Sequence, residues 1–211
     1  MNKSIVQAFI SKHQNILMPF VLLFVCTLSY GIFIPRLGFY WDDWPINWIA
    51  QNLGTEGLAR YFSTNRPYWG KIYALTTQIL GGNPLSWQVF ALLWRWIAAL
   101  SLWLLLKELW KNNYDIANWT AVLFLVYPGF RQQHISLVYS HFFIVLTAFL
   151  LSLYFCILGI RKRKHFIWLT IISLLLSFIN LICLEYFFVL ELIRPFLIWK
   201  VAREKNDHVN T

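Results

Sequence analysis

The chain has 211 residues, of which 59% are hydrophobic and 13% are charged. The charged share is about half of that in soluble domains, and a soluble core of this size has no room for so much apolar surface, which excludes the soluble protein classes. The formal net charge is +9, but Lys and Arg gather in short segments between apolar runs, as the positive-inside rule expects. We therefore predict an integral membrane protein that contacts membrane lipids and not nucleic acid.

Six apolar segments predict an all-α fold, a polytopic transmembrane helical bundle that forms a single domain over residues 1–211. A spanning helix needs about 20 largely apolar residues. The predicted spans are residues 16–35, 84–106, 116–127, 135–160, 166–181 and 185–199. The last two come from one apolar run, Phe166–Trp199, which is too long for one simple span and short for two. We divide it near Asn180–Glu185, whereas a single span would place the basic tail on the other side of the membrane.

The distribution of Lys and Arg orients these spans. Lys3 and Lys12 precede the first span, and the basic segments Lys107–Lys111 and Arg161–Lys164 follow later ones. These positions predict a plasma (inner) membrane protein with both termini in the cytoplasm, so that residues 36–83 form an external loop. Apolar spacing typical of interfacial helices recurs at two places in this loop, Trp48–Leu53 and Ile72–Ile79.

The external loop opens with two adjacent carboxylates. Asp42 and Asp43 lie within the aromatic segment Phe39–Pro45, and Trp and Tyr favour the membrane–water boundary. An acidic pair at headgroup depth suits chemistry on a lipid-linked substrate. The alternative is a helix-capping Asp in an interfacial turn, although two neighbouring carboxylates repel each other and need a reason to stay ionised.

This pair and its position resemble the N-terminal part of the GT-C glycosyltransferases, which include protein O-mannosyltransferases and the lipid A aminoarabinose transferase. The resemblance covers nearly the whole chain by topology, but by motif only Asp42 and Asp43. It implies transfer of a sugar from a polyprenyl-phosphate carrier to an acceptor at the external face, with Asp42 as catalytic base or metal-linked acid and Asp43 in the second place. Members of the family usually have further helices. The chain is therefore expected to be a fragment of a longer module, completed by a C-terminal segment or a second subunit.

Sugar transfer needs a carboxylate that deprotonates or orients the acceptor hydroxyl, and cationic or metal stabilisation of the leaving phosphate. Asp42 and Asp43 could hold a divalent cation, Mg²⁺ or Mn²⁺, because hard cations prefer carboxylate oxygens. Two carboxylates are too few to define such a site, and metal-independent chemistry is the alternative. In the external loop the predicted substrate-binding residues are Arg60, Arg66, Tyr68, Trp69 and Lys71. The aromatic rings could stack on a sugar, and each base has an alternative role in binding lipid headgroups.

A second external loop, Tyr127–His134, is short and densely polar. Arg131 is a predicted phosphate-binding residue, and three side chains are predicted to bind sugar hydroxyls, namely Gln132, Gln133 and His134. The alternative is a solvated turn broken by Pro and Gly. Glu185, near the predicted turn, is a further predicted substrate-binding residue on the same face. The resemblance implies Lys at this place in most enzymes of the family.

Charged side chains also fall inside the apolar runs, where a charge is costly and usually faces a partner or a cavity. Glu191 and Arg194 are three residues apart and can meet on one helix face, whereas Arg95 is the alternative partner of Glu191. We interpret Arg95 and Glu191 as structural. The second functional hypothesis is a non-catalytic membrane protein, such as a transporter subunit or a scaffold, in which the Asp pair only anchors the loop. Transporters place polar residues near mid-membrane, so the polar external face favours the enzyme.

Overall fold

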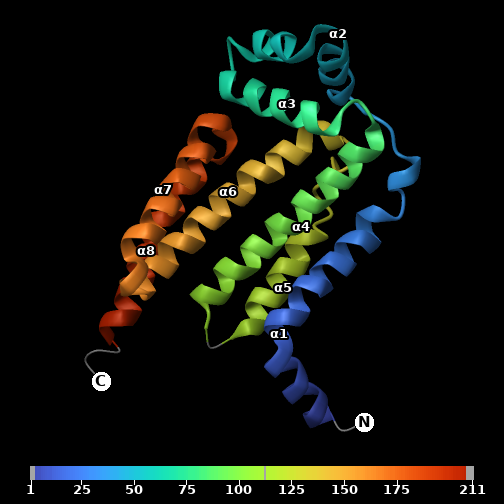
Figure 1. Cartoon of the computed structure of the whole chain (residues 1–211). Helices are drawn as coiled ribbons and strands as arrows, with labels where there is room; N and C mark the ends of the chain where they lie inside the picture. The colour runs from blue at the N-terminus through green and yellow to red at the C-terminus, as the bar shows by residue number, and fades with distance from the viewer. Residues whose placement is uncertain (1–2, 112, 208–211) are drawn as a thin grey trace.

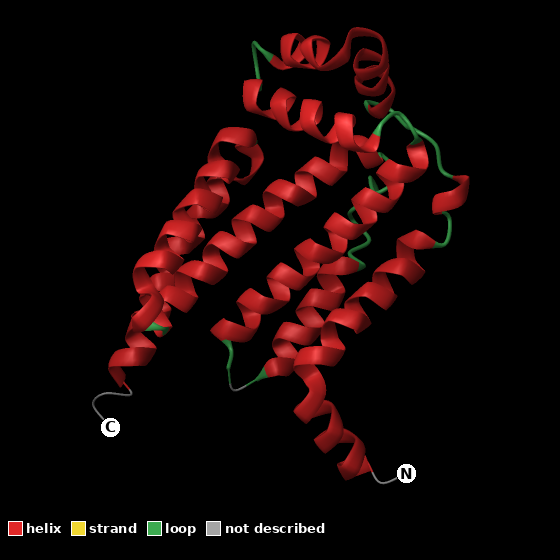
Figure 2. Cartoon of the chain, in the orientation of Figure 1, coloured by secondary structure: helices red, strands yellow, loops and turns green. Residues whose placement is uncertain are grey.

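The computed structural model describes residues 3–111 and 113–207, and every regular element within these ranges is a helix (Figure 2). This confirms the all-α class for the described residues. Four segments are helical, long and apolar enough to cross a membrane: Asn15–Arg36, Pro84–Leu109, Ser136–Arg161 and Arg163–Cys183. They coincide with four of the six predicted spans, and they support a membrane protein.

The four long segments lie side by side (Figure 1). The first includes the end of α1 (Lys3–Cys26) and the short turns η1 (Thr27–Gly31) and η2 (Ile34–Arg36). The other three contain α4 (Pro84–Leu109), α6 (Ser136–Arg161) and α7 (Phe166–Cys183), the last preceded by η3 (Arg163–His165). Helix α6 lies in the middle, because it packs against α4 on one side and against α7 on the other.

The other two predicted spans are shorter helical pieces. Segment 116–127 forms α5 (Tyr114–Leu125), whose 12 residues rise only about 18 Å at 1.5 Å per residue, less than the hydrocarbon thickness of about 30 Å. Segment 185–199 begins as the 3₁₀ helix η4 (Glu185–Leu192) and continues into α8 (Ile193–Asp207). The count of six spans therefore stays a prediction.

The apolar run after residue 166 does divide, at Leu184, whose backbone is extended (φ −151°, ψ 120°). After this break the chain turns back, and α8 packs against α6. At the far end of α8, Lys200 donates to the carbonyl of Leu109, and Glu204 accepts from Arg161 at 2.9 Å. The N- and C-terminal ends of the described chain consequently lie at the same end of the bundle (Figure 1).

The long loop predicted between the first two spans is also helical. It forms α2 (Asp43–Phe62) and α3 (Pro67–Leu80), which cross the opposite end of the bundle (Figure 1). Helix α2 bends at Gly54, where φ is 65°, a conformation that a residue with a side chain rarely adopts. Trp44 and Trp48 remain exposed on α2. The position of these helices along a membrane interface stays a prediction.

The partner of Glu191 is Arg194, and Arg95 lies elsewhere. The carboxylate of Glu191 accepts from Arg194 Nε at 2.8 Å, and Ser177 and Asn180 donate to it from α7. Arg194 also donates to Ser152 on α6 at 2.8 Å. The cluster formed by Glu191, Arg194, Ser152, Ser177 and Asn180, called here the clasp, therefore joins α8 and η4 to α6 and α7.

Candidate functional site

Asp43 is a buried cap for the N-terminus of α6. Its side chain is fully buried, and its Oδ1 accepts a hydrogen bond from the backbone N–H of Val138 at 3.0 Å. The first N–H groups of a helix have no partner within the helix, and the helix dipole favours a negative charge beside them. The predicted capping role is thus present, but the capped helix is α6 and not the helix that Asp43 itself begins.

Burial nevertheless dominates the electrostatics of Asp43. Removal from water raises the pKa of its carboxyl to about 6, against the lowering effect of hydrogen bonds from the start of α6. Its second oxygen, Oδ2, is buried and has no hydrogen-bond partner among the described residues. Asp43 therefore holds α2 against α6. Near neutral pH its carboxylate is charged, and only one of its two oxygens accepts a hydrogen bond.

Asp42 is the exposed member of the pair. It precedes the first turn of α2, and the residue before it, Trp41, has a φ of 49°. A bulky residue in this left-handed region is uncommon and strained, and such strain often occurs at functional sites. The structure thus leaves the carboxylate of Asp42 exposed, where a substrate can reach it.

Arg66 and Glu185, two predicted site residues from distant parts of the chain, form an ion pair. Both Nε and Nη2 of Arg66 donate to the carboxylate of Glu185. The hydrogen bond from Arg66 holds the pKa of Glu185 below its ordinary value, and the same bond raises the pKa of Arg66. The Arg66 guanidinium also lies 5.4 Å from the ring centroid of Tyr186. The carboxylate of Glu185 is therefore paired with an arginine that directly precedes α3.

A row of aromatic contacts joins this ion pair to the acidic pair. Tyr186 lies 5.7 Å from Phe142, and Phe142 stacks on Tyr139 at 5.0 Å between ring centroids. Tyr139 follows Val138, whose N–H binds Asp43. Asp43 and Arg66 consequently stand toward the two ends of one aromatic edge, the row Tyr139–Phe142–Tyr186.

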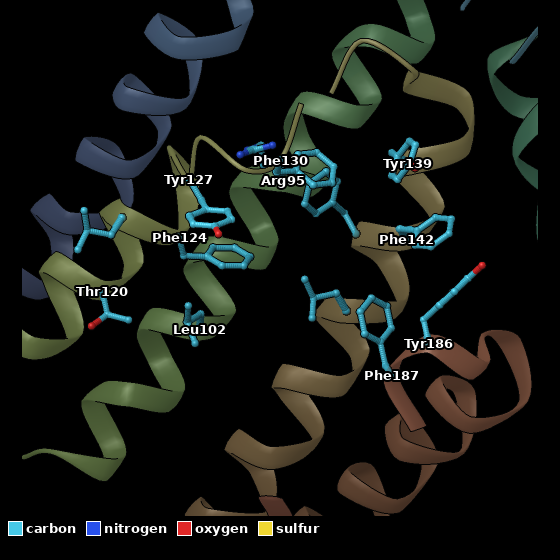
Figure 3. Close-up of a pocket in the computed structure, with 13 residues that line it drawn as sticks. Arg95, Leu102, Thr120, Phe124, Tyr127, Phe130, Tyr139, Phe142, Tyr186 and Phe187 are labelled. Atoms are coloured by element: carbon cyan, nitrogen blue, oxygen red, sulfur yellow. The ribbon is translucent and has the colours of Figure 1, made fainter. Parts of the chain in front are cut away.

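Below this edge lies a cavity of about 610 Å³, within the range of about 300–1,000 Å³ usual for ligand sites. We call it the groove. Its lining comes from α4, α5, α6, η4 and the segment 126–135 (Figure 3). Leu123 and Tyr127 are 64% and 61% exposed, and Tyr186 across from them is 60% exposed, so the groove opens sideways between α5 and η4. Arg95 is the one charged residue among its lining side chains.

Arg95 explains how the short helix α5 can end inside the bundle. Nε and Nη2 of Arg95 donate to the carbonyl of Leu125 at 2.9 and 2.6 Å. Irregular backbone at membrane depth requires polar partners within the protein, and the last carbonyls of a helix have none of their own. Nη1 of Arg95 binds Gln133 Oε1 at 3.1 Å. Arg95 therefore fixes both ends of the segment that follows α5.

The polar side chains of the predicted loop 127–134 do not all face the same way: some are exposed and one is buried against Arg95. Gln133 is buried against Arg95 and does not point toward solvent, so a direct bond from Gln133 to a sugar has no support in this geometry. Arg131 and Gln132 are exposed, and the ring of His134 meets Tyr40 edge-on at 5.0 Å. His134 thus approaches the acidic pair through Tyr40, two residues before Asp42.

The remaining predicted residues lie apart from one another. Trp69 is 2% exposed and its ring packs against Tyr73 and Phe142, so it has no open face for the predicted stacking on a sugar. Tyr68 is exposed, and Lys71 lies 5.2 Å from its ring centroid. Arg60 lines a separate hollow with Ile49 and other residues of α2, which includes none of the other predicted residues.

The described residues offer no third metal ligand beside Asp42 and Asp43. Among the described residues, no group of three or more His, Cys, Asp or Glu side chains is placed to hold an ion. Asp43 is buried and already bound to α6, which leaves Asp42 as the accessible carboxylate. The residues present do not fit a protein-built Mg²⁺ or Mn²⁺ site, and we derive no step through a metal.

Sequence reasoning missed the groove and its edge. Tyr139, Phe142 and Tyr186 read individually as apolar span residues, and the sequence pattern gives no signal that they converge. Comparison with known protein families, with curated proteins and with solved structures finds no match to this chain. Its function must therefore be argued from these residues and their geometry.

Proposed function

We propose that the chain is a GT-C-like glycosyltransferase, or the membrane part of one, that transfers a sugar from a polyprenyl-phosphate carrier to an acceptor at the external face. The observation that carries the proposal is the different burial of the two aspartates of the acidic pair. Asp43 is buried and anchors the start of α6, while Asp42, the residue before it, is exposed. A base positioned on a buried anchor at a membrane-protein surface suits a lipid-linked substrate.

In this proposal Asp42 accepts the proton of the acceptor hydroxyl, or orients that hydroxyl, as the sugar leaves its phosphate. Arg66 stands toward one end of the aromatic edge and can stabilise charge on the leaving phosphate. Its contact with Glu185 is partly exposed, with 27% and 62% of the two side chains accessible, so a phosphate can approach the guanidinium. Arg131 is a second exposed cation that can serve the same phosphate.

The proposal includes an orientation. With the N- and C-terminal ends of the described chain in the cytoplasm, α2, α3 and the acidic pair lie at the external face of the plasma (inner) membrane. The segments α5 and η4–α8 then complete six crossings. In a chain whose native cysteines are replaced, Ser63→Cys should react with an impermeant thiol reagent added to intact cells, and Arg203→Cys should react only after lysis. Labelling of position 203 from outside would contradict the orientation.

Replacement of Asp42 tests the chemistry. Asp42→Asn should lower sugar transfer by about 10²–10⁴-fold, the usual contribution of a general base, without loss of membrane insertion. Transfer is measured with purified protein, a polyprenyl-phosphate sugar and an acceptor, in the full gene product and with any partner subunit. Glu56→Gln is the matched control, because Glu56 is an exposed carboxylate of α2 in the hollow that holds Arg60. Near wild-type transfer by Asp42→Asn would exclude Asp42 as the base.

The second candidate function is a non-catalytic subunit or scaffold. One observation favours it: the hydrogen bond from Val138 to Asp43 gives the acidic pair a purely structural role as an anchor of the loop. The two functions differ in what they require of Asp42. A scaffold should tolerate Asp42→Asn fully and lose only stability with Asp43→Leu. An enzyme should lose transfer with Asp42→Asn at unchanged stability.

A further inference from the structure

We propose that Arg95 is the anchor for the phosphate of an anionic membrane phospholipid, one of whose acyl chains lies in the groove. This site is distinct from the acidic pair, and it does not depend on the proposed sugar transfer. The first observation is the charge itself. Arg95 is 2% exposed in the middle of an apolar helix, yet among the described residues no acidic side chain forms an ion pair with it.

The partners of Arg95 are neutral. They are the carbonyl of Leu125, the amide of Gln133, the hydroxyl of Tyr30 at 2.7 Å, and three aromatic rings. Neutral acceptors satisfy hydrogen bonds, but they leave the net positive charge at membrane depth without a counter-ion. Charged residues within spans normally pair or face a cavity. Arg95 lines the groove, which provides room for an anion.

One donor of the guanidinium is left for that anion. Arginine has five N–H groups, and the four hydrogen bonds of Arg95 occupy Nε, both N–H groups of Nη2 and one of Nη1. The second N–H of Nη1 has no acceptor among the described residues. A phosphate oxygen that accepts from this donor leaves the four existing hydrogen bonds in place.

The groove suits an acyl chain below that phosphate. Apart from Arg95, its lining consists of aromatic and aliphatic side chains with one threonine and three tyrosines, many of them visible in Figure 3. The lateral opening beside Leu123 and Tyr127 allows a chain to enter from the bilayer. The ligand class is therefore a lipid with an apolar chain and a headgroup that carries one negative charge.

The same lining separates this lipid from a sugar donor. Recognition of a sugar needs several polar groups around its hydroxyls, and around Arg95 the groove offers mainly rings, with Phe130 and Phe143 in contact with the guanidinium. Phe130 also packs against Tyr139 at 5.6 Å, and so it lies between Arg95 and the aromatic edge. A phospholipid phosphate, which brings a single negative charge and no required sugar contact, fits better than a sugar-bearing lipid.

The test uses phosphatidylglycerol and phosphatidylcholine, which differ in charge but not in acyl chains. Purified protein in phosphatidylcholine nanodiscs is titrated with phosphatidylglycerol that carries a photoreactive acyl chain, and labelled residues are mapped by mass spectrometry. We expect saturable labelling in the groove, at residues such as Leu102, Leu123 and Leu146, and much weaker labelling by the phosphatidylcholine analogue. Equal labelling by both lipids, or labelling only outside the groove, would overturn the proposal.

Matched variants test whether the charge of Arg95 binds the phosphate. Arg95→Gln should weaken phosphatidylglycerol binding roughly tenfold or more, the scale of one charge-assisted hydrogen bond, whereas Arg203→Gln removes an exposed charge of α8 and should change nothing. If Arg95→Gln does not fold, Leu123→Trp keeps Arg95 and narrows the exposed mouth, and it should reduce labelling by a similar factor. Undiminished labelling in Leu123→Trp would contradict the site. Displacement of phosphatidylglycerol by low concentrations of polyprenyl phosphate would reassign the groove to the carrier lipid and reject a phospholipid site.

Discussion

Arg95 and Arg194 both lie inside apolar runs of the sequence, and their surroundings differ in one respect. Arg194 in the clasp meets a carboxylate, Glu191, at 2.7 Å, and serine hydroxyls complete its bonds. Arg95 meets carbonyl, amide, hydroxyl and aromatic groups but no carboxylate among the described residues. Both sites satisfy hydrogen bonds, but only the clasp also neutralises charge. The comparison separates an arginine whose charge is neutralised within the protein, Arg194, from one whose charge is not neutralised by an acidic side chain among the described residues, Arg95.

The clasp should give the largest effect on stability. Glu191→Gln removes the carboxylate and leaves Arg194 partly buried without a counter-ion, at a cost of about 3–5 kcal/mol. We expect a correspondingly lower free energy of unfolding in detergent, measured by chemical denaturation, with lower folded yield. The reverse result, unchanged stability together with lost binding of a lipid-phosphate sugar, would move Glu191 into the active site.

Double variants sharpen the contrast between the two arginines. Glu191→Leu with Arg194→Leu should recover much of the lost stability, because apolar replacement of a whole buried pair is often neutral. Glu191→Leu with Arg95→Leu should show simple addition of the two single effects, as expected for sites that share no partner. Recovery of stability with Arg95→Leu and not with Arg194→Leu would mean that Arg95, and not Arg194, is the partner of Glu191.

Asp43 is a further buried charged group, and its protonation makes the free energy of unfolding dependent on pH. Its pKa is about 6 in the folded chain against an ordinary value of 3.8, so folding favours the protonated form. Asp43 therefore stabilises most below about pH 4, and this contribution is lost as the pH rises through 6. The shift corresponds to about 3 kcal/mol.

Asp43→Asn should remove this pH dependence. Relative to the wild type, its free energy of unfolding should rise by about 3 kcal/mol between pH 4 and pH 7, as measured by denaturation at fixed pH values. Asp42→Asn is the matched control, since it removes the neighbouring carboxylate, which is exposed. A parallel offset of the Asp43→Asn curve at every pH would show that its carboxyl does not titrate with folding in this range.

The smallest effect belongs to the ion pair of Arg66 and Glu185. Glu185 is 62% exposed, and exposed ion pairs contribute only about 0–1 kcal/mol. A double-mutant cycle with Arg66→Gln and Glu185→Gln should give a coupling energy within that range, and added salt should reduce it. A coupling above about 2 kcal/mol would mean that this pair behaves like the clasp and not like a surface contact.

Local sequence pattern was sufficient for the features that depend on near neighbours. Apolar runs such as Pro84–Leu109 and Ser136–Arg161 form long helices because every backbone polar group is then satisfied within the segment, and composition alone marks them. The spacing of Glu191 and Arg194 likewise allowed their contact. The position of Asp42 and Asp43 just after the first apolar helix could also be predicted.

Only the tertiary structure decided how these pieces act together. Successive residues at a helix start point about 100° apart, so one Asp faces α6 and the other faces solvent, and the packing of α2 against α6 selects Asp43 for burial. Arg66 meets Glu185 across 119 positions of the chain, and α5 ends early enough for Arg95 to hold the following segment. Such contacts depend on how helices pack over long separations, which the spacing of residues along one helix does not encode.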